Sequence, residues 1–310
     1  MKRGFVILAL AVGVAALALG LSFRGEKLPL PSPGDWALPS AHPPADMTLS
    51  TLPTGAMPSV AAFAFRGGGF GDARDFAMTA ILVHHPRGDL LFDTGFGRGV
   101  DRHARAMPWL MKVLSSYRKA TPAADQLATA GYDPARLAGV VLTHAHWDHV
   151  SGLPDMPGVP VWVVASERAF LEARSPSLAR DLGALAYRIY AFDGGPYLGF
   201  AKSLDVWGDG SVVLVPAPGH TPGSVVAFVT LPSGARYALL GDLVWLREGV
   251  EIPAERPWLT RVLVDDDPGA VRENIEHVAA IHARFPEIRL IPAHDARALG
   301  ELPRFPAVAH

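Results

Sequence analysis

The chain has 310 residues, 28 Lys and Arg against 30 Asp and Glu, a formal net charge of −2, twelve histidines and no cysteine. The missing thiols exclude a disulfide scaffold and any thiolate-ligated zinc or iron–sulfur site, so a metal would have to be held by histidine and carboxylate. The near-neutral charge balance gives no electrostatic footprint for a nucleic acid partner.

The first predicted element is an apolar segment at the N-terminus. It follows Lys2 and Arg3 and runs for nineteen residues, Phe5 to Phe23, without a charge. A cationic start followed by an apolar run is typical of a secretory signal, and nineteen residues is close to the ~20 that span a bilayer. We therefore predict that residues 1–23 are a signal peptide or an N-terminal anchor that tethers the chain to a membrane through residues 5–23. The rest of the chain is expected to be exported, either periplasmic or membrane-anchored outside the cytoplasm.

A proline-rich stretch comes next. Residues 28–58 hold eight prolines in 31 residues, which favours extended backbone without hydrogen bonds. We predict a tether over residues 24–46. From Thr48 onward the alternative is an arm with little strand that packs on the domain. Beyond Met57 neither a second linker nor a repeat is expected, so residues 47–310 are predicted to form one domain.

Inside this domain, short apolar runs alternate with helical stretches. The run Ala80–His85, the turn Pro86–Asp89 and the run Leu90–Phe92 predict a β-hairpin. Further strands are predicted at Leu137–Thr143, Val159–Val164, Val212–Val215, Val225–Thr230 and Tyr237–Leu240. Helices are predicted at Met107–Tyr117 and from the Asp267-Pro268 cap to Phe285. Strands interrupted by helices indicate a mixed α/β (α+β) domain.

Potential metal ligands concentrate where one predicted strand ends. His144, His146, Asp148 and His149 follow the apolar run that ends at Thr143. Because side chains alternate in an extended chain, His144 and His146 lie on one face, and the other two can turn in from the following loop. Four such side chains within six residues would be costly to desolvate in a structure that did not use them.

Three more candidate ligands lie in loops immediately after apolar strands. They are His220 after Val215, Asp242 after Leu240 and His294 after the run at Leu290. Each of these residues alone is weak evidence for a functional site, but functional groups often lie in the loops at such strand ends. We therefore expect the seven side chains to form one site.

The segments HAHWDH (144–149), PGHTPGS (218–224), GD (241–242) and AHD (293–295), in this order, resemble those of the metallo-β-lactamase-fold hydrolases. The resemblance implies an αββα sandwich with a dinuclear metal site at one edge of its two sheets. It assigns His144, His146 and His220 to one zinc, Asp148, His149 and His294 to the second, and Asp242 to both. Asp93 matches a position that commonly orients a ligand.

The candidate ligands offer nitrogen and oxygen atoms, and such a ligand set suits two Zn²⁺ ions, with Mn and Fe not excluded. Two divalent ions carry four positive charges; Asp148, Asp242 and a bridging hydroxide neutralise three, leaving about one to stabilise an oxyanion. The hydroxide could attack a carbonyl, and Asp148 could pass a proton to the leaving group. Asp148 and Asp242 are therefore the predicted catalytic residues.

The substrate is a small molecule whose class the motifs only narrow. Lactamases of this fold use a Cys ligand or lack the bridging aspartate, so a β-lactam is not expected. The hairpin at 84–95 favours resemblance to the N-acyl homoserine lactonases, but that group usually has tyrosine where this chain has Trp245, which cannot act as a phenolic acid. A glyoxalase II-like thioesterase, an organophosphate hydrolase and a non-catalytic binding member are the alternatives. The oligomeric state is not predicted.

Two apolar stretches could line an acyl pocket, or could simply pack on the sheets. Their members are Met107, Trp109, Leu110, Met111, Val113, Leu114 and Tyr117 in the first, and Trp245, Leu246, Pro257, Trp258 and Leu259 in the second. Residues 67–71 (GGGFG) are a candidate lid. The remaining histidines are not expected to be ligands: His42, His84, His85, His103, His277, His282 and His310.

Overall fold

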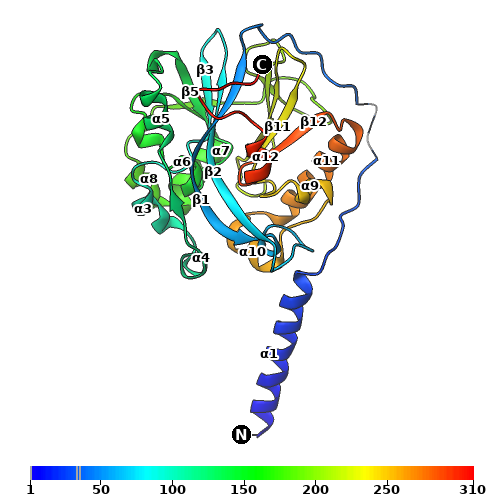
Figure 1. Ribbon diagram of the computed structural model, residues 1–310. Coiled ribbons are helices and arrows are strands. Elements are labelled where there is room, and N and C mark those ends of the chain that lie inside the picture. Colours follow the sequence, from blue (N-terminus) through cyan, green and yellow to red (C-terminus); the bar gives the residue numbers. More distant parts are fainter. Residues whose placement is uncertain (1, 33, 35) are drawn as a thin grey trace.

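Two β-sheets pack face to face and helices cover their outer faces, as Figure 1 shows for the computed structural model. The structure describes residues 2–32, 34 and 36–310. The arrangement is the αββα sandwich predicted for a mixed α/β domain. Buried side chains form one cluster between the sheets and one under the helices on each outer side.

The N-terminal part projects from the sandwich and then runs along it (Figure 1). Helix α1 (Lys2–Ser22) is followed by a segment that carries neither helix nor strand over the described residues between 24 and 44. This segment lies against the domain: the Leu28 side chain is buried, and Trp36 stacks on His277 with ring centroids 5.1 Å apart. Over the residues that the structure describes, no helix is long and apolar enough to cross a membrane.

The first sheet has seven strands in the order β4-β1-β2-β3-β5-β6-β7. They are β1 (Thr48–Val60), β2 (Ala73–His84), β3 (Asp89–Phe92), β4 (Arg118–Lys119), β5 (Leu137–Val141), β6 (Val161–Val164) and β7 (Tyr187–Tyr190). The predicted hairpin is confirmed, since β2 and β3 pair antiparallel and the turn residue Gly88 has a φ of 122°. Strands β5 and β6 continue the sheet in parallel.

Strand β1 corrects the expectation of an arm with little strand. It pairs along its whole length with β2, although it contains Pro53 and Pro58. Its other side pairs with the two-residue strand β4 at Gly55 and Ala56 and forms isolated bridges to the C-terminal segment at Leu49 and Thr51. Away from these contacts the strand lies at the sheet edge, where proline is tolerated. The register shifts between Pro53 and Gly55. This bulge accommodates Pro53, which has no backbone N–H to donate to the neighbouring strand.

The second sheet has five strands in the order β12-β11-β10-β9-β8. They are β8 (Leu204–Asp205), β9 (Val212–Pro216), β10 (Val225–Thr230), β11 (Arg236–Gly241) and β12 (Ile288–Pro292). The predicted strands at 212–215, 225–230 and 237–240 are confirmed within a residue at each end. Leu49, Phe92 and Val141 from the first sheet share the inner core with Leu214 and Val229 from the second.

The larger helices cover the outer faces of the sheets, among them α7, α8 and α11. The helices after α1 are α2 (Ala61–Ala64), α3 (Val100–His103), α4 (Trp109–Leu114), α5 (Ala123–Thr129), α6 (Trp147–Val150), α7 (Ala165–Arg174), α8 (Pro176–Leu182), α9 (Glu248–Glu251), α10 (Trp258–Val264), α11 (Pro268–Arg284) and α12 (Ala296–Gly300). Helix α11 matches its prediction, and the Asp267 carboxylate caps it by accepting from the backbone N–H groups of Gly269 and Ala270. Helix α4 is shorter than predicted, because the backbone turns extended at Ser115 and then forms β4.

Candidate metal centre

All seven predicted ligands meet at one edge of the sandwich. His144 follows β5 and His149 lies on α6, while Asp242 and His294 follow β11 and β12. These strand ends neighbour one another within or across the two sheets, so side chains distant in sequence converge. Three sets of ligand atoms lie within 4.8 Å of one another: His144, His146 and His220; His144, His149 and Asp242; Asp148, His149 and His294.

Asp242 lies between the two outer sets. Its Oδ1 is 3.2 Å from His149 Nε2 and 3.1 Å from His294 Nε2. Its Oδ2 is 3.4 Å from His220 Nε2 and 3.9 Å from His144 Nε2. A carboxylate that faces imidazoles of both sets has the position needed to share two cations.

Partners on the far side of the rings fix which nitrogen faces the centre. The Nδ1 of His149 donates to Asp93 Oδ2 at 2.8 Å, and the Nδ1 of His220 donates to Asp265 Oδ1 at 2.9 Å. The Nδ1 of His294 donates to the backbone carbonyl of Ala77 at 2.8 Å. These contacts hold the tautomer that leaves Nε2 as a lone-pair donor, as the hydrogen-bond partners of metal-binding histidines do.

His146 is turned the other way. Its Nδ1 lies 2.9 Å from His220 Nε2, so this histidine faces the centre through Nδ1. His144 again presents Nε2, because its Nδ1 is 3.2 Å from the Thr143 hydroxyl. The first set would therefore bind a cation through two Nε2 atoms and one Nδ1.

Two buried atoms at the centre lack a hydrogen-bond partner among the described residues. They are His144 Nε2 and Asp242 Oδ1. A buried polar atom without a partner is costly, and such atoms are rare in folded proteins. A divalent cation would satisfy both, so the residues present fit a metal site. Over the part of the chain described, the candidate metal-binding groups include none of the seven histidines predicted to be non-ligands.

The electrostatics of the centre suit cation binding. Burial lowers the pKa of His144 and of His146 well below the ordinary value, so both rings are neutral, as metal ligands must be. Burial opposes ionisation of Asp242, but the imidazoles of His294 and His149 hold its pKa well below the usual range. Burial alone would lower the pKa of His149, but the Asp242 and Asp93 carboxylates raise it well above the ordinary value. A bound cation would displace the extra proton from the His149 ring.

Asp93 orients His149, in agreement with the resemblance. The same carboxylate also accepts from the backbone N–H and hydroxyl of Thr143, at 2.8 and 2.7 Å, and so ties β3 to the end of β5. Its backbone has a φ of 54°, in the left-handed region that Asp tolerates better than most residues. Strained backbone of this kind is common at functional sites.

Two positioning residues were missed in the sequence. Asp265 is buried and accepts from His220 and from the Arg256 guanidinium, which also donates to the backbone carbonyl of Asp242 at 2.9 Å. Asp265 opens the run Asp265-Asp266-Asp267, in which only the helix-capping residue carried a local signal. Nothing in the sequence around Arg256 distinguishes it from a surface arginine.

A third missed residue is Glu167, which is buried on α7. Its carboxylate accepts from the Ala145 N–H at 2.6 Å, the Thr221 hydroxyl at 2.7 Å and the Gly223 N–H at 2.8 Å. Ala145 lies between His144 and His146, and Thr221 follows His220. Glu167 therefore joins the two segments that supply the first ligand set.

We expect Asp265→Ala to weaken metal binding by about 10- to 100-fold, the usual loss when the hydrogen-bond partner of a metal-binding histidine is removed. Without Asp265, the His220 ring loses its tautomer control and the Arg256 charge loses its partner. The measurement is competition for metal with a chelator. Asp266→Ala is the matched control, because its exposed side chain pairs with Arg174 instead. Equal affinities for the two variants would exclude a positioning role for Asp265.

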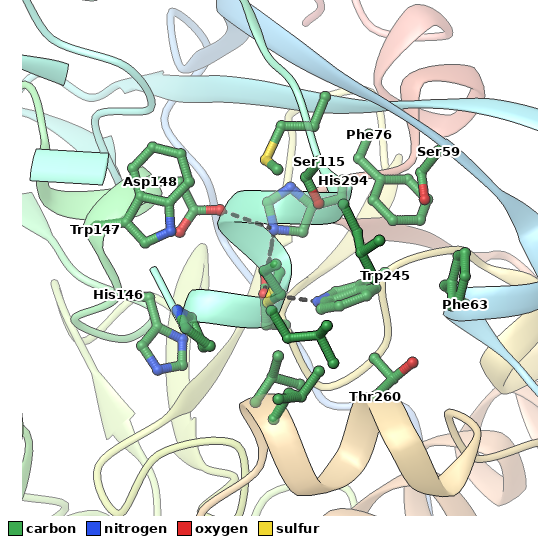
Figure 2. A pocket seen from close by; sticks show the side chains of 18 of the residues that line it. Ser59, Phe63, Phe76, Ser115, His146, Trp147, Asp148, Trp245, Thr260 and His294 are labelled. Atoms are coloured by element: carbon green, nitrogen blue, oxygen red, sulfur yellow. Dashed lines mark hydrogen bonds and ion pairs between the residues drawn. The ribbon is translucent and has the colours of Figure 1, made fainter. Parts of the chain in front are cut away.

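A cavity of about 300 Å³ opens on the centre. Its floor includes His146, Asp148, His220, Asp242 and His294. Figure 2 shows His294 between Asp148 and Trp245. His294 Nε2 lies 3.6 Å from Asp148 Oδ2 and 3.1 Å from Asp242 Oδ1, and the Trp245 indole donates to Asp242 Oδ2. The walls are mainly apolar and come from the end of β1, from α2, α4 and α10: Met57, Val60, Phe63, Leu110, Met111, Leu114, Leu259 and Leu263.

The two stretches expected to line a pocket do so in part. Leu110, Met111 and Leu114 face the cavity, as do Trp245 and Leu259. Met107 and Leu246 instead lie in the core. Trp109, Val113 and Trp258 are exposed to solvent. The short helices explain the division, because only one face of each can reach the cavity.

Trp245 has a role that its residue type did not suggest. Its Nε1–H donates to Asp242 Oδ2 at 2.8 Å. The indole thus orients the central carboxylate while its ring forms part of the cavity wall. A tryptophan cannot supply a proton as a phenol can, but it can hold this aspartate in place.

The family model of the metallo-β-lactamase superfamily matches residues 74–286. Probable metallo-hydrolases of Mycobacterium bovis and Mycobacterium tuberculosis are each 32% identical over 240 residues, covering 69% of this chain and 73% of theirs. An N-acyl homoserine lactonase of Agrobacterium fabrum is 25% identical and covers 76% of this chain and 89% of its own.

Solved structures agree in fold. An N-acyl homoserine lactone hydrolase with N-hexanoyl-L-homoserine bound at its metal centre superposes with a TM-score of 0.67 at 19% identity, covering 87% of this chain and all of that one. A dizinc quorum-quenching lactonase gives a TM-score of 0.54 at 17% identity over 92% of each chain. At sequence identities this low, the similarity to these structures shows a shared fold. The sequence matches, with the ligand geometry, show that the chain belongs to the metallo-β-lactamase superfamily and is a metallo-hydrolase of that family.

Proposed function

We propose that the chain is a dinuclear zinc hydrolase that opens a lactone or a similar ester carrying an acyl chain. The observation that supports this most directly is the combination of seven converging ligands with an adjoining cavity whose walls are apolar. Two bound divalent ions would supply a nucleophile from water at neutral pH and positive charge for a developing oxyanion. His144, His146 and His220 would hold one ion, Asp148, His149 and His294 the other, and Asp242 both.

The protein residues have distinct tasks in this proposal. Asp242, held by Trp245, keeps its carboxylate between the two histidine sets. Asp148 lies on the cavity floor with Oδ2 3.6 Å from His294 Nε2, and is placed to carry a proton toward a leaving oxygen. The apolar walls exclude water from the reacting group and bind the non-reacting part of the substrate.

The acyl chain is inferred from the shape and chemistry of the cavity. Polar and charged groups gather at the floor, while leucine, methionine and phenylalanine side chains form the walls. A substrate with a polar ring or ester at one end and a hydrocarbon tail at the other complements both. The relatives include N-acyl homoserine lactonases, whose substrate is such a molecule, and this supports the choice.

The test is a substrate panel on the purified, zinc-loaded protein. It contains N-acyl homoserine lactones, S-lactoylglutathione, a phosphotriester and nitrocefin. Lactone opening with kcat/KM well above the other substrates supports the proposal. Turnover of the thioester alone or the phosphotriester alone would replace it with the corresponding alternative. No turnover together with fewer than two bound zinc ions would indicate a binding protein.

We expect Met111→Trp to reduce kcat/KM for a decanoyl lactone by about tenfold relative to a butanoyl lactone. The larger side chain would occupy part of the cavity, and apolar-pocket discrimination of this size is usual. Val113→Trp is the matched control on α4, because Val113 is exposed and does not line the cavity. If both variants kept the wild-type chain-length profile, the acyl tail would have to bind elsewhere.

A further inference from the structure

A seven-residue motif occurs twice beside the cavity. PWLMKVL spans residues 108–114 and PWLTRVL spans residues 257–263; the proline, tryptophan, valine and both leucines are identical, and a cation occupies the fifth position. The copies fold alike, because each proline is an N-cap, with ψ of 140° and 153°, and each motif then forms a short helix, α4 or α10. The prediction that no repeat exists beyond Met57 is wrong for this motif.

Each copy places one pair of leucines, four residues apart, on the cavity lining and the preceding pair of side chains in solvent; Leu114, at the end of α4, lines the cavity and is itself 68% exposed. The cavity pairs are Leu110 with Leu114 and Leu259 with Leu263. The solvent pairs are Trp109 with Val113, 72% and 71% exposed, and Trp258 with Val262, 52% and 60% exposed. The two helices thus surround the cavity mouth with exposed apolar side chains, and such patches mark interaction surfaces.

The same end of the molecule carries α1, which projects from it in Figure 1 beyond α4 and α10. Phe23, just after α1, packs on the cavity-wall residue Phe63 and on the exposed Phe70, with ring centroids 6.0 and 5.0 Å apart. The Gly67 N–H donates to the Phe23 carbonyl at 3.0 Å, and α1 contacts α10. These contacts fix the root of α1 beside the cavity mouth.

We propose that this end of the molecule, formed by the two solvent pairs, Phe70 and the root of α1, rests on a lipid bilayer surface with the cavity mouth toward it. Tryptophan prefers the membrane interface, and lysine or arginine beside apolar residues can reach the headgroup phosphates. Lys112 on α4 and Arg24 beside Phe23 are exposed and, within the described residues, form no ion pair. In a face-to-face pair of copies these cations would meet one another, so a lipid surface fits the patch better than a second copy.

This docking would give an acyl substrate dissolved in the bilayer a direct path from lipid to cavity. The inference itself concerns the surface and not the reaction. Its test therefore uses no turnover, and it can fail or succeed independently of the lactonase proposal.

The absence of cysteine makes site-specific labelling clean. Val113→Cys and Val262→Cys, one in each motif, are labelled with an environment-sensitive fluorophore in the full chain. Ser233→Cys is the control, because it is exposed in the turn between β10 and β11, at the sheet end opposite the metal centre. Each protein is mixed with vesicles of phosphatidylcholine and phosphatidylglycerol, with and without shallow doxyl-labelled lipid.

We expect both rim labels to shift to shorter emission wavelength on the vesicles and to lose intensity with doxyl lipid, while the Ser233 label does neither. Rim labels that keep the emission of the Ser233 label on vesicle-bound protein would overturn the proposal, as would failure of the full chain to bind the vesicles. Rim labels that become shielded without lipid as protein concentration rises would assign the surface to a second copy instead.

Discussion

Asp242→Asn should lose at least one of the two bound metal ions and reduce hydrolysis by roughly a thousand-fold, the equivalent of several kcal/mol of transition-state stabilisation. The amide has nearly the shape of the carboxylate, so the change removes charge without opening a cavity. Asp242 faces the Nε2 atoms of four histidines, and its Oδ1 is buried without a hydrogen-bond partner among the described residues. A neutral amide there could not share two cations.

The measurement combines metal content by mass spectrometry with kcat/KM on the best substrate of the panel. Asp266→Asn is a control for loss of a surface carboxylate, and circular dichroism establishes that both variants fold. Retention of two metal ions and full activity by Asp242→Asn would refute the bridging role. If Asp242→Asn lost activity but kept both metal ions, Asp242 would act in the reaction without being needed to hold the two ions.

Glu167→Ala should lower the free energy of unfolding by about 3 kcal/mol, because two buried backbone N–H groups lose the one acceptor they have among the described residues, at a cost of about 1–3 kcal/mol each. These are the N–H groups of Ala145 and Gly223, which belong to the two segments carrying His146 and His220. Metal affinity should fall as well, since the segments are no longer joined. Urea unfolding of the metal-free protein measures the first effect, and chelator competition the second.

Glu172→Ala is the matched control for Glu167. It lies one and a half turns further along α7, is exposed, and pairs only with Arg168 on the same helix. Exposed pairs four residues apart contribute little, so its unfolding curve should coincide with that of the wild type. If the unfolding curve of Glu167→Ala also coincided with that of the wild type, the buried carboxylate would not hold the two loops together.

Much of the fold could be predicted from local patterns. Runs of β-branched residues bounded by turns located the hairpin, β5 and β6 in the first sheet and β9, β10 and β11 in the second, and the Asp267-Pro268 cap located α11. The short strands β4, β7 and β8 were not predicted. Strand β1 could not be found this way, because Pro53 and Pro58 argue against a strand unless the sheet edge is known. Which strands share a sheet depends on pairing between distant segments, and no local pattern encodes it.

The sequence by itself identified the candidate ligands, because His144, His146, Asp148 and His149 are crowded into six residues at the end of one strand, and the family motifs added the other three. Tertiary structure alone decided what surrounds the set. Glu167, Arg256 and Asp265 have no motif, since their task is to hold groups that the fold brings from other strands. Likewise, the two PWL motifs are ordinary apolar helices in the chain. They come to line one cavity only when the fold places α4 and α10 beside it, with leucines facing the cavity and the tryptophans exposed to solvent.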